Sequence, residues 1–210
     1  MRENYLTIPS TGTNELIISK SRFIAHCSRA ESEDEALDFI LKIKKEHSSA
    51  THNCSAYLIG EHDQIQKAND DGEPSGTAGV PMLEVLKKQG LKDIVVVVTR
   101  YFGGIKLGAG GLVRAYGKAT TLGIEAAGIV ECRLHALIKI SVDYTLLGKL
   151  EHEIRNSDYL LDRIEYLEGV DFSVNVERES VERFSEWITN LTSGQSTITV
   201  EKYHFLEFEK

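Results

Sequence analysis

The residues best suited to binding chemistry lie in a glycine-rich segment, residues 100–114, which leaves a predicted buried strand and enters a predicted helix. Glycine lets the backbone approach a ligand closely, and the first turn of a helix presents unpaired N–H groups with a partial positive charge. The segment therefore predicts a site for a negatively charged ligand, which we call the anion seat. Its predicted members are Arg100, Lys106, Gly108, Gly110, Gly111 and Arg114.

The same glycines also have a purely structural explanation, which the sequence leaves open. Glycine is common where a strand turns tightly into a helix or packs closely against a neighbour. Residues 108–113 lack the third glycine of the dinucleotide pattern G-x-G-x-x-G, and no G-x-x-x-x-G-K-[ST] pattern occurs in the sequence. These absences disfavour a kinase, but a phosphorylated small molecule remains an alternative to RNA phosphate as the ligand.

A second segment, residues 70–81, combines turn-forming residues with three carboxylates. These carboxylates could bind a cation, pair with the cations of the anion seat, or be solvated on a surface loop. The spacing matches no EF-hand loop, and no metal site is predicted. If the two segments face each other, Asp71 or Glu73 would clamp Arg100 and hold the seat in shape. The predicted supporting residues are Asp71, Glu73, Thr77 and His52.

A cysteine nucleophile is an alternative use of the strand that contains His52 and Cys54. These side chains, two residues apart on a strand, point to the same face, and His26 could assist them from another strand. Catalysis would need the imidazole within roughly 3 Å of the sulfur and a third group to orient it. Buried cysteine more often behaves as a small apolar residue, so no catalytic residue is assigned and a binding role is favoured over an enzyme.

Composition and charge restrict the class of protein. The 210 residues suggest two domains, and the three cysteines without a C-x-x-C pattern indicate reduced thiols. No apolar run is long enough to cross a membrane and the first residues are polar, so we expect a cytoplasmic protein. Residues 1–134 hold 16 basic and 17 acidic side chains, whereas residues 135–210 hold 8 and 15. The acidic last third is a poor phosphate binder, so any nucleic-acid contact is expected in the first part.

Periodicity predicts the elements that position these residues. A capping box at Ser32 and Glu35 begins a helix that runs to His47, and a short helix with Pro81 in its first turn is expected to end at Gly90. The other elements expected in the first part are strands 15–19, 22–28, 52–60 and 94–99, a loop at 61–71 and a helix at 110–127. After a seam at 134–137, the expected order is strand 138–144, helix 145–154, strands 159–167 and 170–176, helix 181–191 and strand 196–208. That βαββαβ order is the ferredoxin-like arrangement.

Three motifs link the two segments to a known family. They are Asp71-Gly72-Glu73-Pro74 with Gly76-Thr77-Ala78-Gly79, Arg100-Tyr101-Phe102-Gly103-Gly104 with Lys106-Leu107-Gly108, and Gly110-Gly111-Leu112 with Arg114-Ala115-Tyr116. Through them the sequence resembles the IMPACT/YigZ family of uncharacterised proteins, in its bacterial two-domain form. The resemblance implies an α+β protein: residues 1–134 as a ribosomal-protein-like β/α domain with a left-handed crossover, and residues 136–210 as a ferredoxin-like domain similar to the fifth domain of elongation factor G.

The resemblance also implies a function. This pair of folds is similar to the fourth and fifth domains of that elongation factor, which suggests contact with the ribosome or RNA. Eukaryotic relatives regulate translation by binding an activator of a stress kinase, which suggests a translation-related protein partner. We therefore expect a translation-associated, ribosome- or RNA-binding protein, with no cofactor and no membrane contact. The alternatives are a protein or enzyme for a phosphorylated small molecule and an adaptor that acts through its acidic C-terminal domain.

Overall fold

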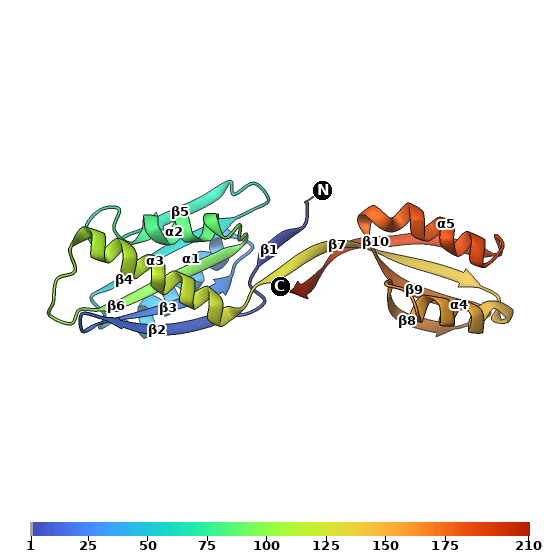
Figure 1. Ribbon diagram of the computed structural model, residues 1–210, viewed down its shortest axis with the longest axis horizontal. Coiled ribbons are helices and arrows are strands. Elements are labelled where there is room, and N and C mark those ends of the chain that lie inside the picture. The colour runs from blue at the N-terminus through green and yellow to red at the C-terminus, as the bar shows by residue number, and fades with distance from the viewer. Residues whose placement is uncertain (1) are drawn as a thin grey trace. The chain divides into compact units, whose positions relative to one another are not determined.

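The computed structural model describes residues 2–210, which form two compact units (Figure 1). The first unit contains the residues up to Cys132 together with Glu207–Lys210, and the second is Arg133–Leu206. The division falls inside a continuous strand, β7 (Val130–Val142), and not in the loop that a domain seam usually occupies. The expected ranges 1–134 and 136–210 remain a proposal, and residues 207–210 belong to the first unit.

The first unit is built on a five-stranded antiparallel sheet with the strand order β2-β3-β6-β4-β5. The strands are β2 (Gly12–Ile18), β3 (Ser21–Arg29), β4 (His52–Ile59), β5 (Ile65–Asn69) and β6 (Ile94–Tyr101). A short strand, β1 (Tyr5–Thr7), pairs with β7. Three helices, α1 (Glu33–Glu46), α2 (Gly79–Lys88) and α3 (Gly108–Ala127), pack on the five-stranded sheet (Figure 1).

The central strand β6 is buried on both faces, which explains its run of valines. Val96 and Val98 belong to the core formed with α2 and α3, whereas Val95 and Val97 belong to a smaller core under α1. Arg100 follows this alternation onto the α2 and α3 side of the sheet, opposite His52 of β4. The glycine-rich segment and the start of β4 therefore meet on one face.

The expected capping box is confirmed, because the Ser32 side chain accepts a hydrogen bond from the Glu35 N–H at the start of α1. Two other expectations were wrong. Residues 65–69 form β5 within the expected loop, paired along β4 by backbone hydrogen bonds that need no apolar side chains. Helix α3 is bounded by Gly108 and Ala127, so it begins two residues before the expected start.

The second unit has the expected βαββαβ order. After β7 come α4 (Leu147–Arg155), β8 (Leu160–Tyr166), β9 (Val170–Glu177), α5 (Val181–Leu191) and β10 (Ser196–Glu209), with short 3₁₀ turns before each helix. β7 pairs with both β9 and β10, and β8 lies beside β9. Apolar residues from one face of this sheet pack with α4 and α5 around Phe172 and Phe184. The α+β fold class, with a ferredoxin-like second unit, is therefore confirmed.

None of the helices within residues 2–210 is long and apolar enough to cross a membrane.

Candidate functional site

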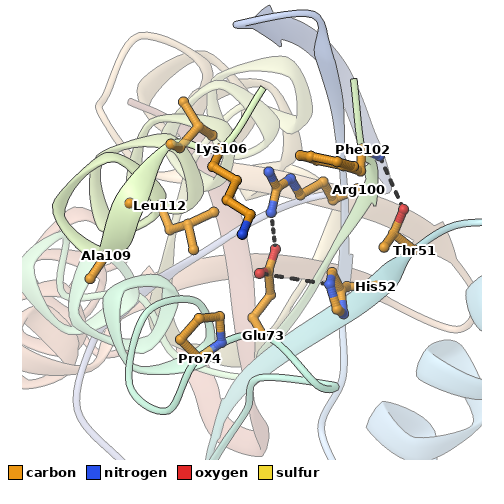
Figure 2. A pocket seen from close by; sticks show the side chains of 11 residues that line it. Thr51, His52, Glu73, Pro74, Arg100, Phe102, Lys106, Ala109 and Leu112 are labelled. Carbon is orange, nitrogen blue, oxygen red and sulfur yellow. Dashed lines mark hydrogen bonds and ion pairs between the residues drawn. The ribbon is translucent and has the colours of Figure 1, made fainter. Parts of the chain in front are cut away.

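A pocket of about 400 Å³ opens in the first unit beside the start of α3 (Figure 2). Its walls come from the start of β4, the segment after β5, the end of β6 and the first turn of α3. The lining residues are Thr51, His52, Glu73, Pro74, Arg100, Phe102, Lys106, Leu107, Gly108, Ala109 and Leu112. The two segments singled out in the sequence therefore do face each other.

The floor of the pocket is a buried ion pair between Arg100 and Glu73, which are 5% and 8% exposed. The Arg100 guanidinium lies 2.6 Å from Glu73 Oε1, and the Tyr116 hydroxyl donates to the same oxygen at 2.8 Å. Burial raises the pKa of Tyr116, so this hydroxyl stays protonated and acts as a donor. The Glu73 Oε2 atom lies 3.7 Å from His52 Nε2 (Figure 2). Of the two carboxylates proposed to clamp Arg100, Glu73 makes the contact.

The other supporting residues hold the loop and do not touch Arg100. Asp71 lies 2.7 Å from the Lys44 ammonium and accepts a hydrogen bond from the Asn53 N–H. Although burial opposes ionisation, these two contacts lower the pKa of the Asp71 carboxyl. The buried Thr77 hydroxyl donates to the carbonyl of Pro74 at 2.6 Å. Asp71 and Thr77 thus shape the wall of the pocket without lining it.

The structure does not support a cysteine nucleophile. Cys54 is fully buried, and its thiol contacts the Asp70 carbonyl and the Tyr116 hydroxyl. Burial raises the pKa of Cys54 to about 12, so the thiolate is scarce at neutral pH. His52 Nδ1 instead bonds the Asp71 carbonyl at 2.8 Å. The suggestion that His26 assists was wrong, because His26 pairs with Val97 and lies on the α1 face of the sheet.

Asp70 closes the positive end of α2. Its carboxylate accepts hydrogen bonds from the N–H groups of Gly76, Ala78 and Gly79 at 2.7 to 3.0 Å. Burial alone would raise the pKa of the Asp70 carboxyl, but these hydrogen bonds outweigh that effect and lower it. The N-terminus of α2 is therefore already occupied by an internal anion.

The start of α3 is open by comparison. The exposed Gly108, Ala109 and Gly110 supply the first N–H groups of this helix, which have no carbonyl partner within it. No side chain caps α3, and its first turn contains no acidic residue. Gly108 adopts φ +70°, a conformation that favours glycine, and a Cβ there would meet no atom within 4 Å. The open amides and the missing anion match what an anion seat requires.

The cations of the predicted seat are not equivalent. Lys106 is exposed and lines the pocket, whereas Arg100 lies on its floor. Gly110, Gly111 and Arg114 lie along α3 outside the lining, and the Arg114 guanidinium reaches back to 3.6 Å from where a Cβ of Gly110 would lie. Lys106, Arg100 and Gly108 are thus brought together at the pocket, while the other three flank it.

Sequence reasoning missed the apolar part of the pocket. Phe102 is 46% exposed at the rim, and its N–H donates to the Thr51 hydroxyl oxygen at 3.0 Å. The Arg100 guanidinium lies 5.4 Å from the centre of the Phe102 ring and 5.3 Å from that of Phe23. The sequence signal that could have identified Phe102 is its position in a polar, glycine-rich loop, where an aromatic side chain is not needed to fill the core.

One glycine fixes the position of this loop. A Cβ on Gly103 would overlap the backbone of Lys20, so only glycine lets the loop contact the turn between β2 and β3. The Gly103 N–H also donates to the Ser21 hydroxyl at 3.1 Å, and the same hydroxyl lies 3.4 Å from the Arg100 guanidinium. This contact therefore ties the rim of the pocket to its floor.

Within residues 2–210, no group of three or more His, Cys, Asp or Glu side chains is arranged to hold a metal ion.

Comparison with known proteins gives two family matches. Residues 19–124 match the Impact N-terminal domain, and residues 140–195 match a domain of unknown function. The IMPACT family member YvyE of Bacillus subtilis is 58% identical over 99% of this chain and 95% of that protein. An IMPACT family member of Haemophilus influenzae is 36% identical over 92% and 95% of the two chains.

More distant similarities cover one unit or the fold as a whole. Protein IMPACT of Rattus norvegicus is 36% identical over 42% of this chain and 29% of that protein, so the similarity to it is limited to part of each chain. A crystal structure described as that of a hypothetical protein is 30% identical, with a TM-score of 0.60 over 96% of this chain and 99% of that one.

Proposed function

The chain belongs to the IMPACT family, and from that premise we propose that it is a translation-associated binding protein whose anion seat contacts phosphate groups of RNA on or near the ribosome. The observation that supports this proposal is the open N-terminus of α3, with Lys106 beside it, in a unit where Asp70 closes the equivalent end of α2. Unpaired N–H groups and a free cation together favour phosphate.

The distribution of free cations favours the same surface. No ion pair involves Lys106 or Arg114 in the part of the chain that the structure describes. On the polar face of the second sheet, by contrast, Lys139 lies 2.6 Å from Asp171, and Arg163 contacts acidic neighbours on both sides. A paired cation gains less from phosphate because it must first give up its carboxylate. Lys106 and Arg114 therefore offer a better phosphate surface than the polar face of the second sheet.

Replacing Lys106 by alanine is expected to weaken binding to single-stranded RNA about three- to tenfold at low salt. Loss of one phosphate contact should also reduce the slope of log affinity against log salt concentration by about 0.7. Filter binding over a series of salt concentrations measures both quantities. Lys42 on α1 is an exposed lysine on the other face of the sheet, so Lys42→Ala is the matched control and should change neither.

Co-sedimentation with ribosomes tests the proposal in its wider form. Association of the wild-type protein should decrease as salt rises, and Lys106→Ala should dissociate at a lower salt concentration than Lys42→Ala. A wild-type protein that binds neither RNA nor ribosomes even in low salt would contradict the proposed function.

A second candidate is the binding of a phosphorylated small molecule at the same site. The pocket volume of about 400 Å³ supports it, since small-ligand pockets span roughly 300–1,000 Å³. A ligand of this kind should raise the melting temperature of the wild-type protein and leave that of Lys106→Ala almost unchanged. A thermal-shift series with nucleotides and sugar phosphates separates this candidate from RNA.

A further inference from the structure

We propose that the pocket beside the anion seat holds one unpaired RNA nucleotide, with its base stacked on Phe102 and its phosphate at Lys106 and the first N–H groups of α3. This inference rests on the proposed function and adds to it the part of the RNA that is recognised. The protein would then bind single-stranded RNA, and a base within a duplex would not enter the pocket.

Phe102 has the position of a stacking platform. It lies at the rim of the pocket, and almost half of its surface is exposed. Exposure of an apolar ring to water is unfavourable, so covering it with a ligand would be favourable. Figure 2 shows its ring beside the Arg100 guanidinium, whose distance from the ring centre is 5.4 Å. Aromatic rings and guanidinium groups are the surfaces on which proteins stack unpaired bases.

The floor offers polar groups that a base edge can satisfy. Arg100 is 95% buried and lines the pocket, and its Nε has no hydrogen-bond partner within residues 2–210. Glu73 Oε2 lies 3.7 Å from His52 Nε2. A buried donor without a partner costs free energy, which a ligand that supplies an acceptor would recover. A nucleobase carries both acceptors and donors along its edge, whereas an apolar side chain carries neither.

The size of the pocket favours one nucleotide over a duplex. Its volume of about 400 Å³ can enclose a single ligand group between apolar walls formed by Pro74, Leu107 and Leu112. In an RNA duplex the faces of the bases are covered by their neighbours, so no base can enter such a pocket without leaving the stack. Single-stranded loops and ends present bases that are free to enter.

The base site and the phosphate site are close enough to serve the same nucleotide. Lys106 and Gly108 line the same pocket as Phe102 and Glu73, and the Lys106 side chain extends toward the ion pair on the floor (Figure 2). The positive end of α3 then favours the phosphate while the apolar walls favour the base.

The test measures fluorescence anisotropy with a labelled single-stranded RNA of about 12 nucleotides, the same RNA annealed to its complement, and the same strand carrying abasic positions. Phe102→Ala should weaken binding of the single strand about tenfold and leave the salt slope unchanged, because stacking releases no counterions. Phe102→Trp should bind at least as tightly as the wild type. Tyr166→Ala, which removes an exposed aromatic residue of the second unit, is the control and should have no effect.

Three results would overturn the inference. One is an affinity for the abasic strand or the duplex equal to that for the intact single strand. Another is a Phe102→Ala variant that binds like the wild type. The third is competition by free nucleoside monophosphates as effective as that by the oligonucleotide, which would make the ligand a free nucleotide. In the first two cases a retained salt dependence would leave the proposed phosphate contact standing, so failure of the inference is distinct from failure of the proposed function.

Discussion

Replacing Glu73 by alanine is expected to lower the free energy of unfolding of the first unit by about 3–5 kcal/mol. The change leaves the Arg100 guanidinium buried without its carboxylate, and the Tyr116 hydroxyl loses its acceptor. An unpaired buried charge costs much more than the pair contributes, because desolvation is no longer offset. Urea unfolding followed by circular dichroism measures the loss as a lower midpoint.

The surface ion pair between Glu15 and Arg22 is the matched control for this prediction. Its two side chains are 2.9 Å apart but 40% and 50% exposed, so Glu15→Ala should leave the free energy of unfolding almost unchanged. A double variant with Glu73→Leu and Arg100→Met should recover much of the stability that Glu73→Ala loses. Equal small losses for Glu73→Ala and Glu15→Ala would show that the floor of the pocket is not a desolvated ion pair.

Replacing Asp70 by alanine is expected to cost about 2 kcal/mol at neutral pH, because the N–H groups of Ala78 and Gly79 at the start of α2, and that of Gly76 in the preceding loop, lose their acceptor. The folded protein lowers the pKa of Asp70, so this stabilisation is present above the unfolded pKa of about 4 and is lost as the pH falls through the lower folded value. The difference in unfolding free energy between wild type and Asp70→Ala should therefore shrink in acid.

Denaturation at pH 7 and at about pH 3 measures this dependence. Asp38 on α1 is exposed and makes no ion pair in the described part of the chain, so Asp38→Ala should stay within about 0.5 kcal/mol of the wild type at both pH values. A cost for Asp70→Ala that is the same at both pH values would mean that the charge of Asp70 does not matter. In that case α2 would not be a helix with an occupied anion site.

The ferredoxin-like second unit could be predicted because its elements have strong periodicity. Alternating apolar residues in β7 and β9 and the helical spacing of Phe184 and Ile188 leave few other arrangements. β5 could not be predicted in this way. Its pairing with β4 uses backbone groups, and only Ile65 along its length packs against a core, so the segment has the polar composition of a loop.

The charged residues of the candidate site could be predicted from the sequence, but the shape of the pocket could not. The sequence indicated that a carboxylate from residues 71–73 contacts Arg100, but it did not distinguish Asp71 from Glu73. The choice is made by the backbone, because Asp71 adopts φ +46° and its side chain turns to Lys44. Phe102 and Leu112 were not identified, since the pocket they line exists only once the end of β6 is folded over the first turn of α3.

NMR spectroscopy of the ¹⁵N-labelled protein can show whether the first amides of α3 hold a phosphate. Titration with single-stranded RNA should shift the amide resonances of Gly108, Ala109 and Gly110 more than any others, and Lys106→Ala should reduce those shifts. The amides of Gly76, Ala78 and Gly79, which Asp70 already occupies, should move little. RNA-dependent shifts concentrated in the second unit, with the resonances of Gly108 to Gly110 unchanged, would mean that the start of α3 does not bind the phosphate.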